Sequence, residues 1–242
     1  MRQLLLSTST VHGTNYLDYA ETHVRAFFGS SVKRVLFVPF ALHDRDAYAA
    51  KARERFERLG YGCDALHTAA AAGAATAQQA VASAEAVFVG GGNTFRLLDT
   101  LQRLELIEPL RRRVQGGMPY MGASAGSNLA CPTIMTTNDM PIVQPRSFDA
   151  LGLVPFQINP HYLDPEPNSK HMGETREQRI REYHEQNQRS VVGLREGGIL
   201  LREGDRLQLI GQSGARVFRR GGEPVEFRPG DDLSGLLGSQ SC

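Results

Sequence analysis

Short apolar runs alternate with longer amphipathic stretches over the first 125 residues. Residues 3–7 and 35–39 are rich in Leu and Val, which is typical of strands covered on both faces in a parallel sheet. Further strands are predicted at residues 61–66, 86–89 and 119–122. Apolar residues at helical spacing predict helices at residues 15–28, 44–59 (capped by Asp44), 69–84 (broken at Gly73), from about 94, and 107–114. This alternation predicts a doubly wound α/β fold with a mostly parallel sheet.

The pattern changes after about residue 150. A short strand is expected at residues 157–159, a surface loop at 164–173 and a strongly charged helix at 174–188. Short β runs separated by glycines fill residues 191–227 and predict hairpins, and residues 230–242 are expected to form a frayed tail. With no internal repeat and no clear linker, we expect one domain over residues 1–242, with a C-terminal β-hairpin region.

Composition and charge exclude several classes of protein. The 242 residues are 41% hydrophobic and 22% charged, with a net charge of +1, as in an ordinary globular protein. Lys and Arg are scattered, which disfavours nucleic acid as a partner, and no apolar run approaches the roughly 20 residues of a membrane span. The first apolar stretch is too short for a signal peptide. Three widely spaced cysteines without a CxxC pair argue against a disulfide framework and a zinc site, so a reducing cytoplasm is expected.

The clearest chemical motif is residues 122–126 (GASAG), which matches the G-x-S-x-G pattern of a nucleophile. A serine on a tight turn between a strand and a helix exposes its hydroxyl, and the neighbours must be small because their backbones pass close together. A strand is expected before Ser124 and a helix after it. We therefore favour Ser124 as a nucleophile over an inert small-residue turn, with backbone N–H groups of the following helix to bind an oxyanion.

A serine nucleophile needs a base, and histidine is the usual one near neutral pH. Of the seven histidines, His161 follows a short strand and opens a loop, which favours it modestly, whereas His171 and His184 lie in polar segments and are expected to be exposed. Glu196 precedes a glycine turn and is one candidate for the acid that orients the histidine. Asp139, Asp149 and Glu174 are its competitors.

Several longer segments make the sequence resemble the peptidase E (alpha-aspartyl dipeptidase) family. They are residues 89–95 (VGGGNTF), 124–133 (SAGSNLACPT), 136–143 (TTNDMPIV), 159–161 (NPH) and 173–180 (GETREQRI), together with residues 4–7 and 38–40. The matches extend from the first predicted strand to about Glu196. Two departures are Ala123, where the family usually has a bulkier residue, and the weakly matched residues 164–171.

This resemblance implies a flavodoxin-like fold related to class I glutamine amidotransferases and a serine dipeptidase without metal or cofactor. Its implied substrate is a dipeptide with an N-terminal aspartate, and the chain would be a monomer or a homodimer. By the same resemblance the catalytic residues are Ser124, His161 and Glu196, and the oxyanion is bound near Gly91, Gly92 and Ala125. Arg176 would pair with the aspartate side chain, and Asp139 would either accept the substrate amino group or merely cap a turn. A charged helix with a solvated face would explain Arg176 equally well without the resemblance.

Two rival functions stay open at this point. A cyanophycinase-like hydrolase would share the fold and the serine but act on β-linked aspartyl bonds. A non-catalytic protein could bind a small molecule or nucleotide at residues 90–92 (GGG), although this run lacks the GxGxxG and GxxxxGK[ST] spacings. An amidotransferase is disfavoured because position 124 holds Ser rather than Cys.

Overall fold

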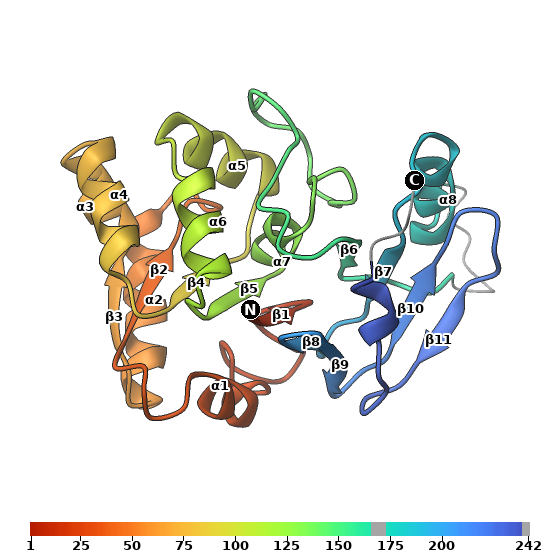
Figure 1. Ribbon diagram of the computed structural model, residues 1–242, viewed down its shortest axis with the longest axis horizontal. Helices are drawn as coiled ribbons and strands as arrows, with labels where there is room; N and C mark the ends of the chain where they lie inside the picture. Colours follow the sequence, from red (N-terminus) through yellow and green to blue (C-terminus); the bar gives the residue numbers. More distant parts are fainter. Residues whose placement is uncertain (166–172, 239–242) are drawn as a thin grey trace.

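The computed structural model describes residues 1–165 and 173–238. Its larger sheet has seven strands in the order β3-β2-β4-β5-β1-β8-β9 (Figure 1). The strands are β1 (Arg2–Leu6), β2 (Arg34–Val38), β3 (Gly62–Ala65), β4 (Val87–Val89), β5 (Tyr120–Ala123), β8 (Gly198–Glu203) and β9 (Arg206–Gly211). The first five run parallel to one another, whereas β8 and β9 are antiparallel additions at one edge. The predicted, mostly parallel α/β sheet is confirmed.

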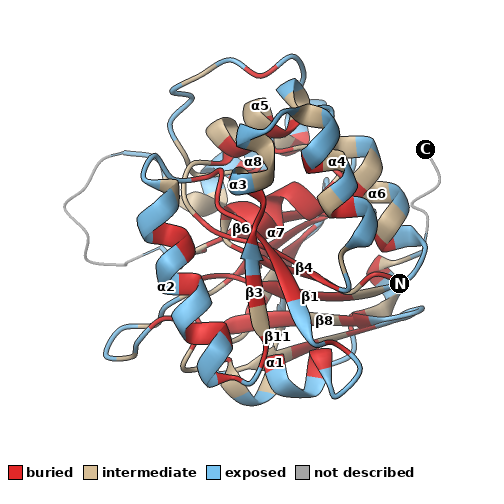
Figure 2. Cartoon of the chain, turned by 90° about the vertical axis from the view of Figure 1, so that its left-hand side faces the viewer, coloured by how far each residue is buried: buried red, intermediate tan, exposed pale blue. Residues whose placement is uncertain are grey.

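Helices cover both faces of this sheet because successive strand residues point to opposite sides. On β1, Leu4 and Leu6 belong to one buried cluster and Leu5 belongs to another. The first cluster packs against α1 (Glu21–Phe28) and α2 (Arg45–Arg58). The second packs against α3 (Leu66–Ala71), α4 (Ala74–Ser83), α5 (Thr94–Arg103), α6 (Ile107–Gln115) and α7 (Ala125–Ala130). Figure 2 shows the buried strands between these two helical layers.

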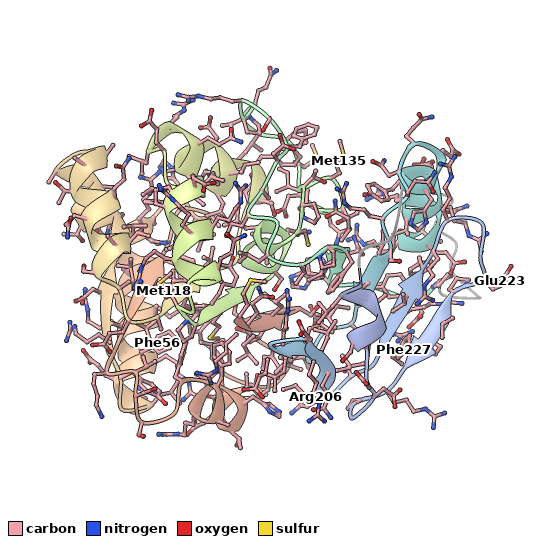
Figure 3. The ribbon with its side chains drawn as sticks, viewed as in Figure 1. Phe56, Met118, Met135, Arg206, Glu223 and Phe227 are labelled. Carbon is pink, nitrogen blue, oxygen red and sulfur yellow. The ribbon has the colours of Figure 1, made fainter. Side chains whose placement is uncertain are left out.

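A second sheet lies beside the first and has the order β11-β10-β7-β6. Its strands are β6 (Gln157–Pro160), β7 (Val191–Leu194), β10 (Ala215–Phe218) and β11 (Val225–Phe227), and α8 (Arg176–Gln186) lies against it (Figure 1). Figure 3 shows Phe227 in this part, away from Phe56 and Met118 near the larger sheet. One buried cluster contains residues of both sheets, including Leu5 and Val192. That the whole chain is a single domain stays a prediction.

Local signals account for several element boundaries. Asp44 caps α2 by accepting a hydrogen bond from the Ala47 N–H at 2.9 Å, as predicted. Gly73 has φ of +113°, which only glycine adopts easily, and it separates α3 from α4 where the break was expected. Thr175 and Gln178 form a capping box at the start of α8.

Three expectations differ from the structure. The helix expected at residues 15–28 begins only at Glu21, because residues 15–20 form turns. Residues 230–238 are not a frayed tail, because Leu233 and Leu236 are buried against the core. His184 is buried at 7% exposure, and its Nε2 lies 3.0 Å from the Arg189 carbonyl oxygen.

Two parts of these predictions lie outside the described residues. They are residues 166–172 of the expected loop, which include His171, and residues 239–242 of the expected tail. Within residues 1–165 and 173–238, no helix is both long and apolar enough to cross a membrane.

Candidate active site

Ser124 occupies the sharp turn between β5 and α7. Its φ of +52° with ψ of −109° is a strained conformation for a residue other than glycine, with a typical cost of about 1–3 kcal/mol. The surrounding backbone holds it there: the Ser124 N–H donates to the Leu6 carbonyl at 3.0 Å, and the Ser124 carbonyl accepts from the N–H groups of Ser127 and Asn128. The strand, turn and helix around Ser124 are those expected from the sequence.

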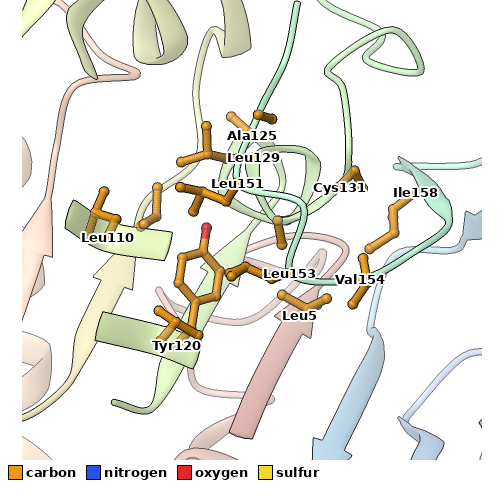
Figure 4. Packing of buried hydrophobic residues seen from close by; sticks show 14 of the residues in the cluster. Leu5, Leu110, Tyr120, Ala125, Leu129, Cys131, Leu151, Leu153, Val154 and Ile158 are labelled. Atoms are coloured by element: carbon orange, nitrogen blue, oxygen red, sulfur yellow. The ribbon is translucent and has the colours of Figure 1, made fainter. Parts of the chain in front are cut away.

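Small residues are required around this turn. A Cβ on Gly126 would lie 2.1 Å from the Val89 carbonyl oxygen, and one on Gly122 would lie 2.5 Å from the Gly126 carbonyl oxygen. The Tyr120 hydroxyl donates to the same Gly126 carbonyl at 2.7 Å from within the core, and Figure 4 shows Leu153 beside the ring. The turn is therefore fixed by close backbone contact and by a buried hydrogen bond.

His161 also has a left-handed backbone conformation, with φ of +54°, directly after β6. Its N–H donates to the Ser7 hydroxyl oxygen at 2.9 Å, and that hydroxyl donates to the Leu194 carbonyl at 2.8 Å. Ser7 thus links the carboxyl ends of β1, β6 and β7 and fixes the backbone that carries the imidazole.

The structure brings Ser124, His161 and Glu196 together. The His161 Nε2 lies 2.9 Å from the Ser124 Oγ, and the His161 Nδ1 lies 3.0 Å from the Glu196 Oε1. The His161 and Glu196 side chains are 37% and 47% exposed. This is the arrangement that a serine nucleophile, a general base and an orienting acid require.

Glu196 lies in the turn that joins β7 of the smaller sheet to β8 of the larger one. Its neighbour Arg195 anchors that turn through two hydrogen bonds of 2.7 Å to the Asp164 carboxylate and two, of 3.0 and 3.1 Å, to the Glu226 carboxylate. Two parallel bonds between a guanidinium and a carboxylate fix orientation well, so the position of Glu196 is well determined.

The three competing acids contact other groups. Asp139 accepts hydrogen bonds from the Thr94 N–H and hydroxyl at 2.8 and 2.6 Å. Asp149 lies in an isolated β-bridge with Thr133, and Glu174 pairs with Arg179 at 3.5 Å. Glu196 is therefore the carboxylate that contacts His161 within the described part of the chain.

The glycine run after β4 lies against the serine. A Cβ on Gly91 would be 3.2 Å from the Ser124 Cβ, and Gly92 has φ of +130° with no room for a side chain beside the Ala41 carbonyl. Both glycines line one cavity with Ser124. Burial raises the pKa of Tyr48, and hydrogen bonds to its hydroxyl oxygen from the Tyr16 hydroxyl and then from the Gly91 N–H partly oppose that rise. Tyr48 therefore stays protonated beside the glycine run.

The charges of Asp139 and Arg176, which lie on different segments of the chain, interact with each other. Partial burial lowers the pKa of Arg176, as does the nearby Arg179, while Asp139 opposes both effects. Among the side-chain hydrogen bonds and ion pairs between described residues, none involves the Arg176 guanidinium. The loop of Asp139 is tied to the site, because the Asn138 amide donates to the Pro160 carbonyl at 2.7 Å, next to His161.

Several residues that support this site were not singled out from the sequence. Ser7 and Thr94 each follow the end of a parallel strand, where functional groups gather in such sheets, and this position was a usable signal. Tyr48 lies on the buried face of α2, where its spacing looks like ordinary core packing. No group of three or more His, Cys, Asp or Glu side chains in residues 1–165 and 173–238 is arranged to hold a metal ion.

Comparison with known proteins shows the family and the fold of this chain. The model of peptidase family S51 matches residues 3–210. The chain is 54% identical to peptidase E of Streptomyces coelicolor, over 98% of this chain and 95% of that protein. It is 47% identical to a "probable alpha-aspartyl dipeptidase" of Drosophila melanogaster, over 97% of this chain and 96% of the relative.

The crystal structure of a peptidase from an acI-B1 actinobacterium has the same fold, with a TM-score of 0.72 at 17% identity and 96% coverage of both chains. The chain belongs to peptidase family S51. The resemblance to peptidase E seen in the sequence and the expected α/β fold are both confirmed.

Proposed function

We propose that this chain is a serine dipeptidase that hydrolyses dipeptides with an N-terminal aspartate. The observation that carries the proposal is the continuous hydrogen-bonded series from Ser124 through His161 to Glu196. Whole-length similarity to proteins named peptidase E and alpha-aspartyl dipeptidase supports the substrate class.

In the proposed reaction the Ser124 Oγ attacks the peptide carbonyl carbon while the His161 Nε2 takes its proton. Glu196 holds the imidazole in the required tautomer and stabilises the imidazolium. The carbonyl oxygen becomes an oxyanion that accepts hydrogen bonds from the N–H groups of Ala125 and Gly92, because the Gly91 N–H is directed at the Tyr48 hydroxyl. His161 then protonates the leaving amine. Water, activated by the same imidazole, releases aspartate from the acyl-enzyme.

Arg176 and Asp139 are proposed to select the aspartyl residue. A guanidinium pairs with a carboxylate through two parallel hydrogen bonds, and Arg176 has no such partner among the described residues. Asp139 carries the opposite charge, which suits the free α-amino group of a dipeptide. Together the two residues would require a free amino group and an acidic side chain on one substrate residue.

The test is hydrolysis of Asp-Leu, Glu-Leu, Ala-Leu and β-Asp-Leu, each with and without a metal chelator. The proposal expects cleavage of Asp-Leu alone, unaffected by the chelator. Preferential cleavage of β-Asp-Leu would favour the cyanophycinase-like alternative. Cleavage of none of the four would contradict the peptidase proposal and favour a binding protein.

We also propose that the chain works in the reducing cytoplasm. Cys63 and Cys131 are both free and buried, and burial raises the pKa of each thiol to about 12, which keeps both unreactive. The choice between monomer and homodimer stays a prediction.

A further inference from the structure

A cavity of about 580 Å³ opens on one side of Ser124. Its walls come from the loop after β1, from the first turns of α2 and from the glycines that follow β4. Its lining includes Tyr16, Tyr48, Lys51, Asp44 and His161. The two tyrosines are buried and meet edge to face, with ring centroids 6.2 Å apart, so they form a firm wall.

This cavity lies on the side of the leaving group. In acyl transfer the histidine delivers its proton to the departing nitrogen, so the leaving residue must lie on the same side as the imidazole. His161 lines this cavity, whereas Asp139 and Arg176 do not. The residue after the cleaved bond would therefore occupy the cavity, and the aspartyl residue would lie on the other side of Ser124.

Lys51 provides the permanent positive charge in the lining. Its Nζ lies 4.8 Å from the centroid of the Tyr16 ring and forms no ion pair with any described carboxylate. Asp44 also lines the cavity, but its carboxylate caps α2 through the Ala47 N–H. The Lys51 ammonium is therefore available to a negative group that enters beside Tyr16.

We propose that this cavity binds the second residue of the dipeptide and that Lys51 pairs with the substrate's C-terminal carboxylate. The inference rests on the proposed dipeptidase function and adds a residue that reads chain length. In a dipeptide the only carboxylate beyond the cleaved bond, other than a side chain, belongs to the second residue. Amidation or extension of that residue removes the charge from this position, and cleavage should weaken accordingly.

The experiment compares kcat/KM for Asp-Leu and for Asp-Leu-amide in the wild type and in Lys51→Met, Lys51→Arg and Arg53→Met. Removing a charge-assisted contact of this kind costs about tenfold, so the wild type should prefer the free acid by about tenfold. Lys51→Met should bring the ratio to about one, whereas Lys51→Arg should keep most of it.

Arg53→Met is the matched control, because Arg53 is on the same helix but its Nε faces the Cys63 carbonyl at 3.4 Å, away from the cavity. It should keep the wild-type ratio. Equal cleavage of both substrates by the wild type, or an unchanged preference in Lys51→Met, would overturn the role of Lys51 while leaving the dipeptidase proposal intact. Cleavage of neither substrate by the wild type would overturn both.

Discussion

Replacement of Glu196 by Gln tests how much the carboxylate contributes to the rate of hydrolysis when it and His161 are partly exposed to solvent. The substitution keeps the size of the side chain but removes the charge that faces the His161 Nδ1 at 3.0 Å. The imidazolium that forms when Ser124 attacks then loses an anionic partner. Two unit charges about 4 Å apart attract by about 1 kcal/mol in water and by about 4 kcal/mol at an effective dielectric constant of about 20.

The His161 and Glu196 side chains are 37% and 47% exposed, so the pair lies between these limits. A stabilisation of about 2 kcal/mol, or about 30-fold in kcat, is therefore expected. This figure counts the lost charge alone, and it is far below the roughly 10⁴-fold loss found where the amide of an Asp-to-Asn change holds the histidine in the wrong tautomer.

The assay is the steady-state rate of Asp-Leu hydrolysis by Glu196→Gln beside Glu203→Gln. Glu203 is the matched control, because it is an exposed glutamate that pairs only with Arg2, at 3.7 Å, among the described residues. A decrease in kcat of less than about threefold in Glu196→Gln would refute the role of the carboxylate. A decrease in kcat near 10⁴-fold would show that partial exposure does not weaken the interaction between His161 and Glu196.

Three further predictions concern substrate recognition, the serine turn and stability. Arg176→Met should lower kcat/KM for Asp-Leu by about 100-fold in steady-state assays, because a charge-assisted pair is lost. Gly126→Ala should destabilise the fold by about 3 kcal/mol in urea unfolding, because its Cβ would lie 2.1 Å from the Val89 carbonyl oxygen. Burial lowers the pKa of His184, so stability should fall as pH drops below about 6.5, and His184→Gln should reduce that dependence in unfolding at about pH 7.5 and about pH 5.5.

Each of these three has a control or a contradicting outcome. Arg179→Met, one turn along α8 and paired with Glu174, should keep the activity that Arg176→Met loses. Gly235→Ala, with open space at its Cβ, should keep wild-type stability. For His184 the direction of the pH dependence follows from its lowered pKa. The unfolded chain binds the proton more readily than the folded chain, so the free energy of unfolding decreases as the pH falls. An identical pH dependence in His184→Gln would contradict that linkage.

The sequence was sufficient for the five parallel strands of the larger sheet because its local signals agree with one another, whereas the pairing of β8 with β1 joins segments far apart in the chain. Leu and Val runs predicted the buried strands, Asp44 predicted a cap, and Gly73 predicted a helix break. The prediction of a frayed tail was wrong for a physical reason. Leu233, Leu236 and Leu237 lie between glycines and polar residues without a regular period, and only the tertiary fold places Leu233 and Leu236 against the core.

Within the site, the sequence identified Ser124 from a local motif, because a strained turn requires small neighbours within five residues. His161 was favoured only by position, and Glu196 by family resemblance. The contacts that select these two depend on strands far apart in the chain, such as the Ser7 hydroxyl that joins β1 to His161. Lys51 could not be found from the sequence, because nothing local shows that its helix faces the serine.

The central claim is that Ser124 carries an aspartyl acyl group during turnover. The most direct test is rapid acid quenching of the wild type during turnover of an aspartyl ester, followed by proteolysis and mass spectrometry. We expect one aspartyl group on the peptide that contains Ser124. In Ser124→Ala this group should be absent and the rate should be lower by several orders of magnitude. An aspartyl group on another residue, or near-wild-type turnover by Ser124→Ala, would contradict this claim.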